Sequence, residues 1–412
     1  SRGSIFVVDA EIRNCLEKGE ISSLTDEYTQ LFQNNGIIIE QELNEQDSYK
    51  LMYEGSKYNT VSTALHFITT YQCNLACVYC YEGKGELYHK SMDKETAKCA
   101  VQFIKNQVQN NNSRSLGIEL FGGEPLLNMS VNLIAAEQLR EWCEETNVHF
   151  SINAITNGTL STLQNVEDLA QYKSSFLVTL DGPKEIHDKR RIYKNGKGTF
   201  DDIVEGLYRV RDSHLGIMIR INADEVNKDH IVFLFEFLKD NGLSNVVISI
   251  KPVFNTSPAC LSYGYCMPDL EGLKVINDLY TVARKMNFKT EEAEKPSPQG
   301  ACSAQRMAYF AIDPYLRLFK CAILPPYEKN CVGTVSRENF TPIFNHVNVD
   351  FLSRDPLTFE ECRMCELMPI CRGGCPAEVY DVKGTTHGNI CRKQGMYDTL
   401  KENLTNFVKR TA

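Results

Sequence analysis

Apolar runs alternate with amphipathic segments through the middle of the chain. From about residue 63 to 253, six strand-like runs are separated by segments whose apolar residues recur at helical spacing. Because parallel strands need long crossovers, which helices supply, this alternation predicts a parallel sheet of the α/β class. The predicted strands are 64–70, 117–121, 150–155, 176–180, 217–221 and 246–250, and the predicted helices are 94–109, 131–145, 162–171, 201–212 and 229–240.

The pattern is the same for an open parallel sheet and for a barrel. In both architectures, functional residues gather at the carboxyl ends of the strands. The first predicted strand runs directly into Cys73. We therefore expect the chemistry of the chain to begin in the loop after that strand.

The first 62 residues have a different pattern, which predicts a small winged-helix-like module. Two short helices are expected between an opening strand and a returning strand, followed by a linker. The strands are expected at 5–8 and 37–39, the helices at 9–18 and 22–34, a helix-breaking turn at Asn35-Gly36 and the linker at about 55–59.

The last part of the chain, about 254–412, has weaker periodicity, several turn signals and most of the cysteines. A region of this kind is expected to depend on bound metal for its order. The pattern thus divides the chain into three parts, 1–62, 63–253 and 254–412.

Composition narrows the possible function classes. The chain is 42% hydrophobic and 24% charged, which is typical of a soluble protein. Its net charge of -9 and lack of a long basic run argue against binding to nucleic acid. No membrane span or signal peptide is apparent, so we expect a cytoplasmic protein. Sixteen cysteines in a chain of this length indicate metal binding rather than a disulfide framework.

The first cysteine cluster contains Cys73, Cys77 and Cys80. Three thiolates in one loop can hold three corners of a [4Fe–4S] cube and leave the fourth iron open to another molecule. The spacing alone also allows a zinc site with a distant fourth ligand, or reduced thiols in a loop.

A second motif, Gly122-Gly123-Glu124-Pro125, closes the second predicted strand. With the three cysteines, it makes residues 64–253 resemble the radical S-adenosylmethionine (SAM) superfamily. The resemblance implies a partial (β/α)6 TIM barrel and an oxidoreductase. One electron from the cluster would split SAM into methionine and a 5′-deoxyadenosyl radical, which abstracts hydrogen from a substrate.

The motif match also implies contacts to SAM, while no catalytic residue is assigned beyond the cluster. Gly122, Gly123 and Glu124 would hold the methionyl amine, and Tyr79 would lie near adenine. Turn or surface roles are the alternative for four further candidates. These are Thr156, Asn157 and Asp181 as ribose contacts, and Arg191 as a bidentate partner of the methionyl carboxylate.

The C-terminal cysteines, from Cys362 to Cys391, would by spacing alone suggest a zinc ribbon. Their arrangement resembles the SPASM extension of radical SAM enzymes, which implies two auxiliary [4Fe–4S] clusters and three clusters in total. Leu316 stands where the family signature has glycine. The implied ligands are Cys362, Cys365, Cys371 and Cys391 for the outer cluster, and Cys302, Cys321 and Cys375 for the inner cluster.

A fourth cysteine for the inner cluster is missing from its usual place. Either Cys331, Cys260 or Cys266 replaces it, or one iron is open to a substrate thiolate. The open site and Cys331 are the favoured alternatives.

The N-terminal module resembles the leader-binding domain of peptide maturases, which pair a precursor's leader with an edge strand. We therefore expect a maturase of ribosomally made peptides that forms a thioether between a cysteine and a carbon. Its partners would be a precursor peptide with a leader and a low-potential electron donor, flavodoxin or ferredoxin.

Three other functions stay open at this point. One is carbon–carbon crosslinking or another radical modification of a peptide, and another is a cluster-carrying, peptide-binding protein without turnover. The third is an anaerobic sulfatase-maturing enzyme, which needs an acidic base near the inner cluster. Ala322, Ile323 and Leu324 follow Cys321 and weaken that reading.

Overall fold

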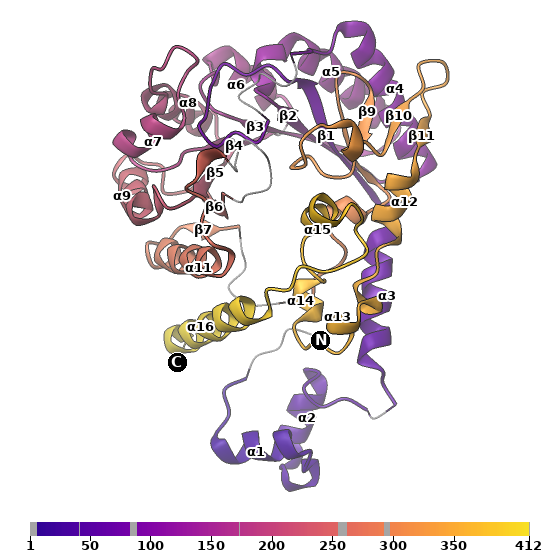
Figure 1. Ribbon diagram of the computed structural model, residues 1–412, viewed down its shortest axis with the longest axis vertical. Helices are drawn as coiled ribbons and strands as arrows, with labels where there is room; N and C mark the ends of the chain where they lie inside the picture. The colour runs from indigo at the N-terminus through magenta and orange to yellow at the C-terminus, as the bar shows by residue number, and fades with distance from the viewer. Residues whose placement is uncertain are drawn as a thin grey trace.

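A sheet with six consecutive parallel strands forms the body of the protein (Figure 1). The computed structural model describes residues 6–40, 42–82, 89–172, 174–253, 262–291 and 297–411. All six strands predicted from the apolar runs are confirmed. They are β1 (Ser62–Thr70), β2 (Ser115–Gly122), β3 (His149–Thr156), β4 (Ser175–Thr179), β5 (Gly216–Ala223) and β6 (Val247–Pro252).

Helices join these strands and cover one face of the sheet (Figure 1). The five predicted crossover helices are confirmed, and the structure adds α7, a seven-residue helix with too few apolar residues to show a periodicity. The helices are α4 (Lys94–Asn110), α5 (Met129–Glu145), α6 (Leu163–Ala170), α7 (Lys184–Arg190), α8 (Phe200–Asp212) and α9 (Ile231–Asp240).

The sheet continues beyond both ends of this six-stranded unit. On one side β8 (Tyr309–Ile312) pairs parallel with β1, and on the other side β7 (Lys289–Thr290) pairs parallel with β6. Beyond β8 lie the short antiparallel strands β9 (Arg317–Phe319), β10 (Gly333–Val335) and β11 (Pro342–Phe344). Within the described strands β7 and β11 are the two ends of the sheet, so the fold is a partial TIM barrel rather than a closed one.

The N-terminal residues form helices, but the strands expected beside them are wrong for the described residues 6–40. The two short helices are confirmed as α1 (Ala10–Lys18) and α2 (Asp26–Asn34). After α2, the main-chain N–H groups of Ile37 and Ile38 bond back to Phe32 O, at 2.8 and 3.3 Å. This segment closes the helix C-terminus instead of pairing as a strand. A winged-helix-like sheet is therefore not part of these residues.

The expected linker at 55–59 is also wrong, because helix α3 runs from Glu45 to Tyr58. Gly55 suggested a break, but it lies on the exposed side of the helix, where glycine costs only about 0.5–1 kcal/mol relative to alanine. The opposite side of α3 packs on the C-terminal region: Tyr49 Oη donates to Gln299 O at 3.1 Å, and Tyr53 Oη donates to Gln305 Oε1 at 2.9 Å. The boundary of the N-terminal module therefore lies before α3.

Besides the strands β7 to β11, the C-terminal region consists of helices and turns that face the barrel (Figure 1). The long helices α11 and α16 contact each other. Among the described residues, no helix is long and apolar enough to cross a membrane. The helices of this region are α11 (Asp269–Lys285), α12 (His346–Ser353), α13 (Glu360–Arg363), α14 (Met368–Cys371), α15 (Pro376–Lys383) and α16 (Lys393–Thr411).

Replacing Tyr53 with alanine should lower the free energy of unfolding by about 3–5 kcal/mol, because the fully buried ring leaves a cavity under α3. Leu51, on the same helix and 77% exposed, is the matched control, and Leu51→Ala should change stability by less than about 0.5 kcal/mol. Chemical denaturation measures both variants. Equal effects would show that α3 does not pack as described.

Candidate active site

The loop after β1 carries Cys73, Cys77 and Cys80, and the main chain after α7 holds it in place. Ala76 N donates to Ile192 O at 2.8 Å, and Val78 N donates to Arg190 O at 3.0 Å. Burial raises the pKa of Cys73 to about 12, and the charges of Glu124, Cys77 and Cys80 contribute to this shift. The three thiols therefore lie close enough to influence one another, as ligands of one cluster must.

The Gly-Gly-Glu-Pro motif lies directly against the start of this loop. Gly123 N donates to Thr70 O at 3.1 Å, and Glu124 N donates to Gln72 O at 2.8 Å. Gly122 has a φ of 132°, and a Cβ atom at Gly122 or Gly123 would overlap carbonyl oxygens of residues 70–72. Only glycine permits this approach, so the motif sets the path of the chain into Cys73.

The carboxylate of Glu124 ties the end of β2 to the end of β3. It is fully buried and accepts hydrogen bonds from Thr156 Oγ1 and Asn157 N, both at 2.7 Å, and from Leu126 N at 3.0 Å. Burial raises the pKa of Glu124, and these hydrogen bonds oppose the shift. The structure thus brings Glu124, Thr156 and Asn157 together beside the cysteine loop, while their contacts to SAM remain predictions.

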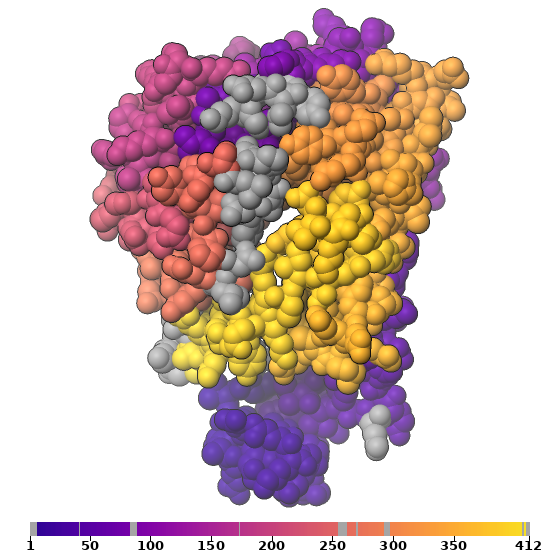
Figure 2. Space-filling view, viewed as in Figure 1, coloured from indigo at the N-terminus to yellow at the C-terminus, as the bar shows by residue number. Residues whose placement is uncertain are grey.

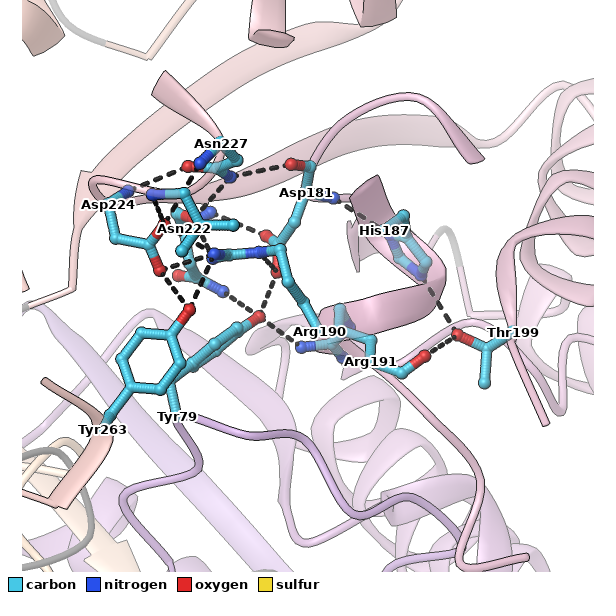
Figure 3. A network of polar contacts seen from close by, with 11 residues as sticks. Tyr79, Asp181, His187, Arg190, Arg191, Thr199, Asn222, Asp224, Asn227 and Tyr263 are labelled. Carbon is cyan, nitrogen blue, oxygen red and sulfur yellow. Dashed lines mark hydrogen bonds and ion pairs between the residues drawn. The ribbon is translucent and has the colours of Figure 1, made fainter. Parts of the chain in front are cut away.

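Three other predicted site residues meet in one polar network (Figure 3). Tyr79 Oη donates to Asp181, and Arg191 Nη1 donates to Tyr79 Oη at 3.0 Å. Asn222 Nδ2 also donates to Tyr79 Oη, at 3.2 Å. The network therefore joins the cysteine loop to residues that follow β4 and α7 and to the end of β5.

Arg190, which the sequence analysis missed, is the most buried cation of this network. Its side chain is 1% exposed, and it forms an ion pair with Asp224 and a hydrogen bond from Nη2 to Asn222 O at 2.8 Å. The guanidinium also lies 5.0 Å from the centre of the Tyr79 ring. The pair Arg190-Arg191, and Asn222-Ala-Asp224 just after a predicted strand, were the sequence signals for these residues.

His187 connects the network to Thr199 through both of its ring nitrogens. Nδ1 accepts from Asp181 N at 3.1 Å, and Nε2 lies 3.0 Å from Thr199 Oγ1. Because Thr199 Oγ1 itself donates to Arg191 O, the proton between the two side chains belongs to His187 Nε2. Burial and the charges of Arg191 and Arg190 lower the pKa of His187 well below 6.5. The ring is therefore neutral at pH 7.

Arg191 offers a test of whether SAM fits this site. Its Nε is buried and has no hydrogen-bond partner within the described residues. An unfilled guanidinium donor beside the three-cysteine loop suits an anionic group such as a carboxylate. The residues present therefore fit the methionyl end of SAM beside a cluster held by Cys73, Cys77 and Cys80.

Among the C-terminal cysteines, two sets influence the pKa values of their own members, while their roles as cluster ligands stay predictions. Burial raises the pKa of Cys321 to about 12, with contributions from Cys375 and Cys302. Burial also raises the pKa of Cys362, and the cysteines that add to this shift are Cys371, Cys365 and Cys391.

A cavity of about 320 Å³ borders both groups and is lined by Cys302, Cys371 and Cys375. In Figure 2 the yellow C-terminal segment lies beside a hollow in the face of the molecule that is shown. In the described part of the chain, no three His, Cys, Asp or Glu side chains converge on a single ion. A cubane needs no such convergence, because each thiolate binds a different iron.

The remaining candidate ligands lie in other surroundings. Cys331 packs in an apolar cluster with Ile68 and Phe319, and its thiol donates to Gly333 O at 3.1 Å. Cys266 packs near Tyr79, and Cys260 lies outside the described residues. A ligand role for any of them stays a prediction.

Leu316 keeps the turn for which the family signature uses glycine. It adopts a left-handed conformation, with a φ of 61°, and its N–H donates to Asp313 O at 2.9 Å. Its side chain is 2% exposed in the core. Apolar burial thus offsets the backbone cost of a left-handed leucine.

Comparisons with known proteins agree with this geometry. The Radical SAM superfamily model matches residues 67–249, so this part of the chain is a radical SAM domain. With the cysteine loop and the partial barrel, it defines the protein as a radical SAM enzyme.

Two relatives illustrate how far the similarity extends. MJ0907 of Methanocaldococcus jannaschii is 32% identical over 174 residues, but the match covers 41% of this chain and 55% of that protein. The radical SAM cyclopropyl synthase TigE of Paramaledivibacter caminithermalis is 22% identical, and the match covers 96% of this chain and 84% of TigE.

Solved structures share the fold. The structure of anSMEcpe with bound AdoMet and a peptide has a TM-score of 0.65 at 18% sequence identity, and the match covers 84% of this chain and 99% of anSMEcpe. Streptococcus suis SuiB, bound to S-adenosylmethionine, has a TM-score of 0.57 at 17% sequence identity. The match covers 92% of this chain and 86% of SuiB.

Asp224→Asn should lower the free energy of unfolding by about 3–5 kcal/mol, because it removes the carboxylate that pairs with the buried guanidinium of Arg190. Asp201→Asn is the control, since Asp201 pairs with Lys184 while 74% exposed and should cost less than about 1 kcal/mol. Urea denaturation compares the two variants. A cost below 1 kcal/mol for Asp224→Asn would contradict the network.

The neutral state of His187 should make stability depend on pH. Its folded pKa lies below its unfolded value of about 6.5, so the unfolded chain takes up a proton first as pH falls. Its contribution is complete above about pH 6.5 and declines below it, by up to about 1.4 kcal/mol per pH unit.

His187→Gln should therefore make the decline in unfolding free energy from pH 6.5 to 5 shallower. His149→Gln, at an exposed position, should keep the slope of the wild type. The same slope in all three proteins would refute a buried neutral His187.

Proposed function

We propose that this radical SAM enzyme is a maturase that crosslinks a ribosomally made precursor peptide through a cysteine thioether. The observation that carries the proposal is that Cys302 and Cys375 line one cavity of about 320 Å³ and that both thiols contribute to the raised pKa of Cys321. With these three thiolates as its protein ligands, a [4Fe–4S] cluster would have one corner left for a substrate thiolate. The packing of Cys331 against Ile68 and Phe319 supports such an open corner.

The barrel residues would bind and orient SAM. A [4Fe–4S] cluster held by Cys73, Cys77 and Cys80 would supply the electron that splits SAM into methionine and a 5′-deoxyadenosyl radical. Arg191 has an unfilled donor for the methionyl carboxylate, and Tyr79 and Asp181 form the polar wall beside it. The close contacts of Gly122 and Gly123 with residues 70–72 set the path of the chain into the cysteine loop.

The proposed crosslink balances as follows. The carbon loses a hydrogen atom to the adenosyl radical, the cysteine thiol loses a proton, and one electron is left when the C–S bond forms. That electron needs an acceptor, which the proposed auxiliary site at Cys302, Cys321 and Cys375 would provide. The product is therefore two hydrogens lighter than the precursor.

Exposed apolar side chains in the N-terminal module support peptide recognition there. Val7 is 73% exposed, Ile37 42% and Leu43 50%. Since no edge strand lies within residues 6–40, the proposal rests on these side chains and not on strand pairing. SuiB, which shares the fold, has been solved with its precursor peptide SuiA.

The proposed cellular location and electron donor follow from the chemistry of iron–sulfur clusters. Thiolate-ligated clusters need a reducing compartment, which supports a cytoplasmic location, and a low-potential donor such as flavodoxin or ferredoxin.

Carbon–carbon bond formation is the second candidate. The observation that favours it is the match to the cyclopropyl synthase TigE, which extends over 96% of this chain. A peptide modified in this way keeps its cysteine thiol free. The two products can therefore be distinguished chemically.

The test is anaerobic incubation of the reconstituted, reduced enzyme with SAM and a Cys-containing precursor, followed by mass spectrometry. We expect 5′-deoxyadenosine and a peptide two hydrogens lighter whose cysteine no longer reacts with iodoacetamide. Cys73→Ala should abolish both products, since it removes a proposed cluster ligand. Cys99 lies in α4, outside the three cysteine groups, so Cys99→Ala should still give both products.

Each other result has a defined meaning. A peptide two hydrogens lighter that still alkylates would replace the thioether with a carbon–carbon link. Release of 5′-deoxyadenosine by Cys73→Ala would refute the radical SAM site. No peptide change with any Cys-containing precursor, but oxidation of a sulfatase peptide, would favour the sulfatase-maturing function.

A further inference from the structure

The guanidinium of Arg354 is a buried cation in the C-terminal region. Its side chain is 0% exposed, and all of its N–H-bearing nitrogens donate to main-chain carbonyl groups. The acceptors are the carbonyl oxygens of Thr386 (from Nε, 2.9 Å), Arg372 (from Nη1, 2.9 Å) and Gly373, Gly388 and Gly374 (from Nη2, 2.9, 3.3 and 3.5 Å).

No carboxylate is found among the partners of Arg354 in the described part of the chain. The guanidinium carbon also lies 5.2 Å from the centre of the Phe359 ring, and the Tyr53 side chain is a further neighbour of the guanidinium. Carbonyl dipoles satisfy the N–H groups, but they leave the full positive charge inside the protein. A buried charge without a counter-ion is costly, which points to a negative group nearby in the working protein.

The carbonyl groups that Arg354 binds belong to the segments that carry the auxiliary cysteines. Residues 372–374 are the three residues between Cys371, assigned to the outer site, and Cys375, assigned to the inner site. Gly373 has a φ of 71°, and a Cβ atom there would lie 3.0 Å from Arg354 Nη2. The loop therefore folds around the guanidinium, and one side chain fixes the spacing between the two sites.

The main chain of Arg354 also reaches toward the inner site. Its carbonyl oxygen accepts from Gln305 Nε2 at 3.4 Å, and Gln305 N donates to Cys302 O at 2.8 Å. Lys57 of α3 donates to the same Arg354 carbonyl at 3.2 Å. Arg354 thus lies where α3, the Cys302 turn and the 371–375 loop meet.

We infer that Arg354 is a positioning residue for both auxiliary sites and the counter-charge for iron–sulfur clusters held there. The inference rests on the auxiliary sites of the proposed function. Thiolate-ligated clusters are anionic, and their reduction potential depends on nearby charge and hydrogen bonds. A buried cation favours the reduced, more negative state, so Arg354 should raise the reduction potential.

The test uses the full chain with Cys73, Cys77 and Cys80 replaced by alanine, so that iron reports only on the auxiliary sites. Iron per chain and midpoint potential, from an EPR-monitored titration, are measured in this parent and three variants. Arg354→Gln removes the positive charge. Arg354→Lys keeps the charge, but its single ammonium group with three N–H donors replaces a planar guanidinium with five. Arg363→Gln is the matched control, because Arg363 is exposed between Cys362 and Cys365.

The parent should hold about eight iron atoms, four for each cluster. Arg354→Gln should lose at least half of this iron, and the remainder should titrate at a more negative potential. Arg354→Lys should also lose iron but keep the parent's potential. Arg363→Gln should resemble the parent in both measurements.

Contrary results separate the possible failures. If Arg354→Gln keeps both the iron content and the potential, the inference is wrong while the auxiliary sites stand. A parent without iron would overturn the auxiliary sites and the inference together, but not the SAM site. If Arg354→Gln does not fold, Arg354→Lys decides, since an unchanged iron content in that variant contradicts a positioning role.

Discussion

The loop after β1 is held tightly between two neighbouring segments, and the geometry of the whole site follows from this contact. Gly122 and Gly123 hold one side of the loop through contacts with residues 70–72 that a Cβ atom would prevent. The main chain at 190–192 holds the other side. Because the loop is fixed from both sides, three cysteines that are spread over eight residues can act as one ligand set.

Buried charged side chains are concentrated beside the cysteine loop. Arg190 ends α7 and Arg191 follows it. Asp181 and Asp224 lie just after neighbouring strands, and Tyr79 of the cysteine loop contacts this group (Figure 3). Such a network is costly to desolvate and stabilising only when complete. It therefore fixes the orientation of Arg191, whose buried Nε has no hydrogen-bond partner within the described residues.

The barrel and its cysteine loop could be predicted from the sequence because their signals are local. Each strand is a run of apolar residues, and the glycines of the motif are required by one close approach. The polar network was only partly predictable, since Arg190 pairs with Asp224, which is 34 residues away, and no local pattern records that contact.

The predictions of the N-terminal strands and of the linker were wrong for a related reason. Ile37 and Ile38 have the composition of a strand, but the main chain there completes the end of α2. Gly55 is a residue type that often interrupts helices. The tertiary packing of Tyr49 and Tyr53 nevertheless keeps α3 helical on both sides of Gly55. In both segments, contacts elsewhere in the fold outweighed local preference.

The central claim is that Cys73, Cys77 and Cys80 leave one iron for SAM to bind beside Arg191. EPR spectroscopy of the reduced, anaerobically reconstituted full-length protein, recorded with and without SAM, tests it most directly. SAM should change the cluster signal of the wild type, and Arg191→Met should require a higher SAM concentration for the same change. Superimposable spectra with and without saturating SAM would contradict it.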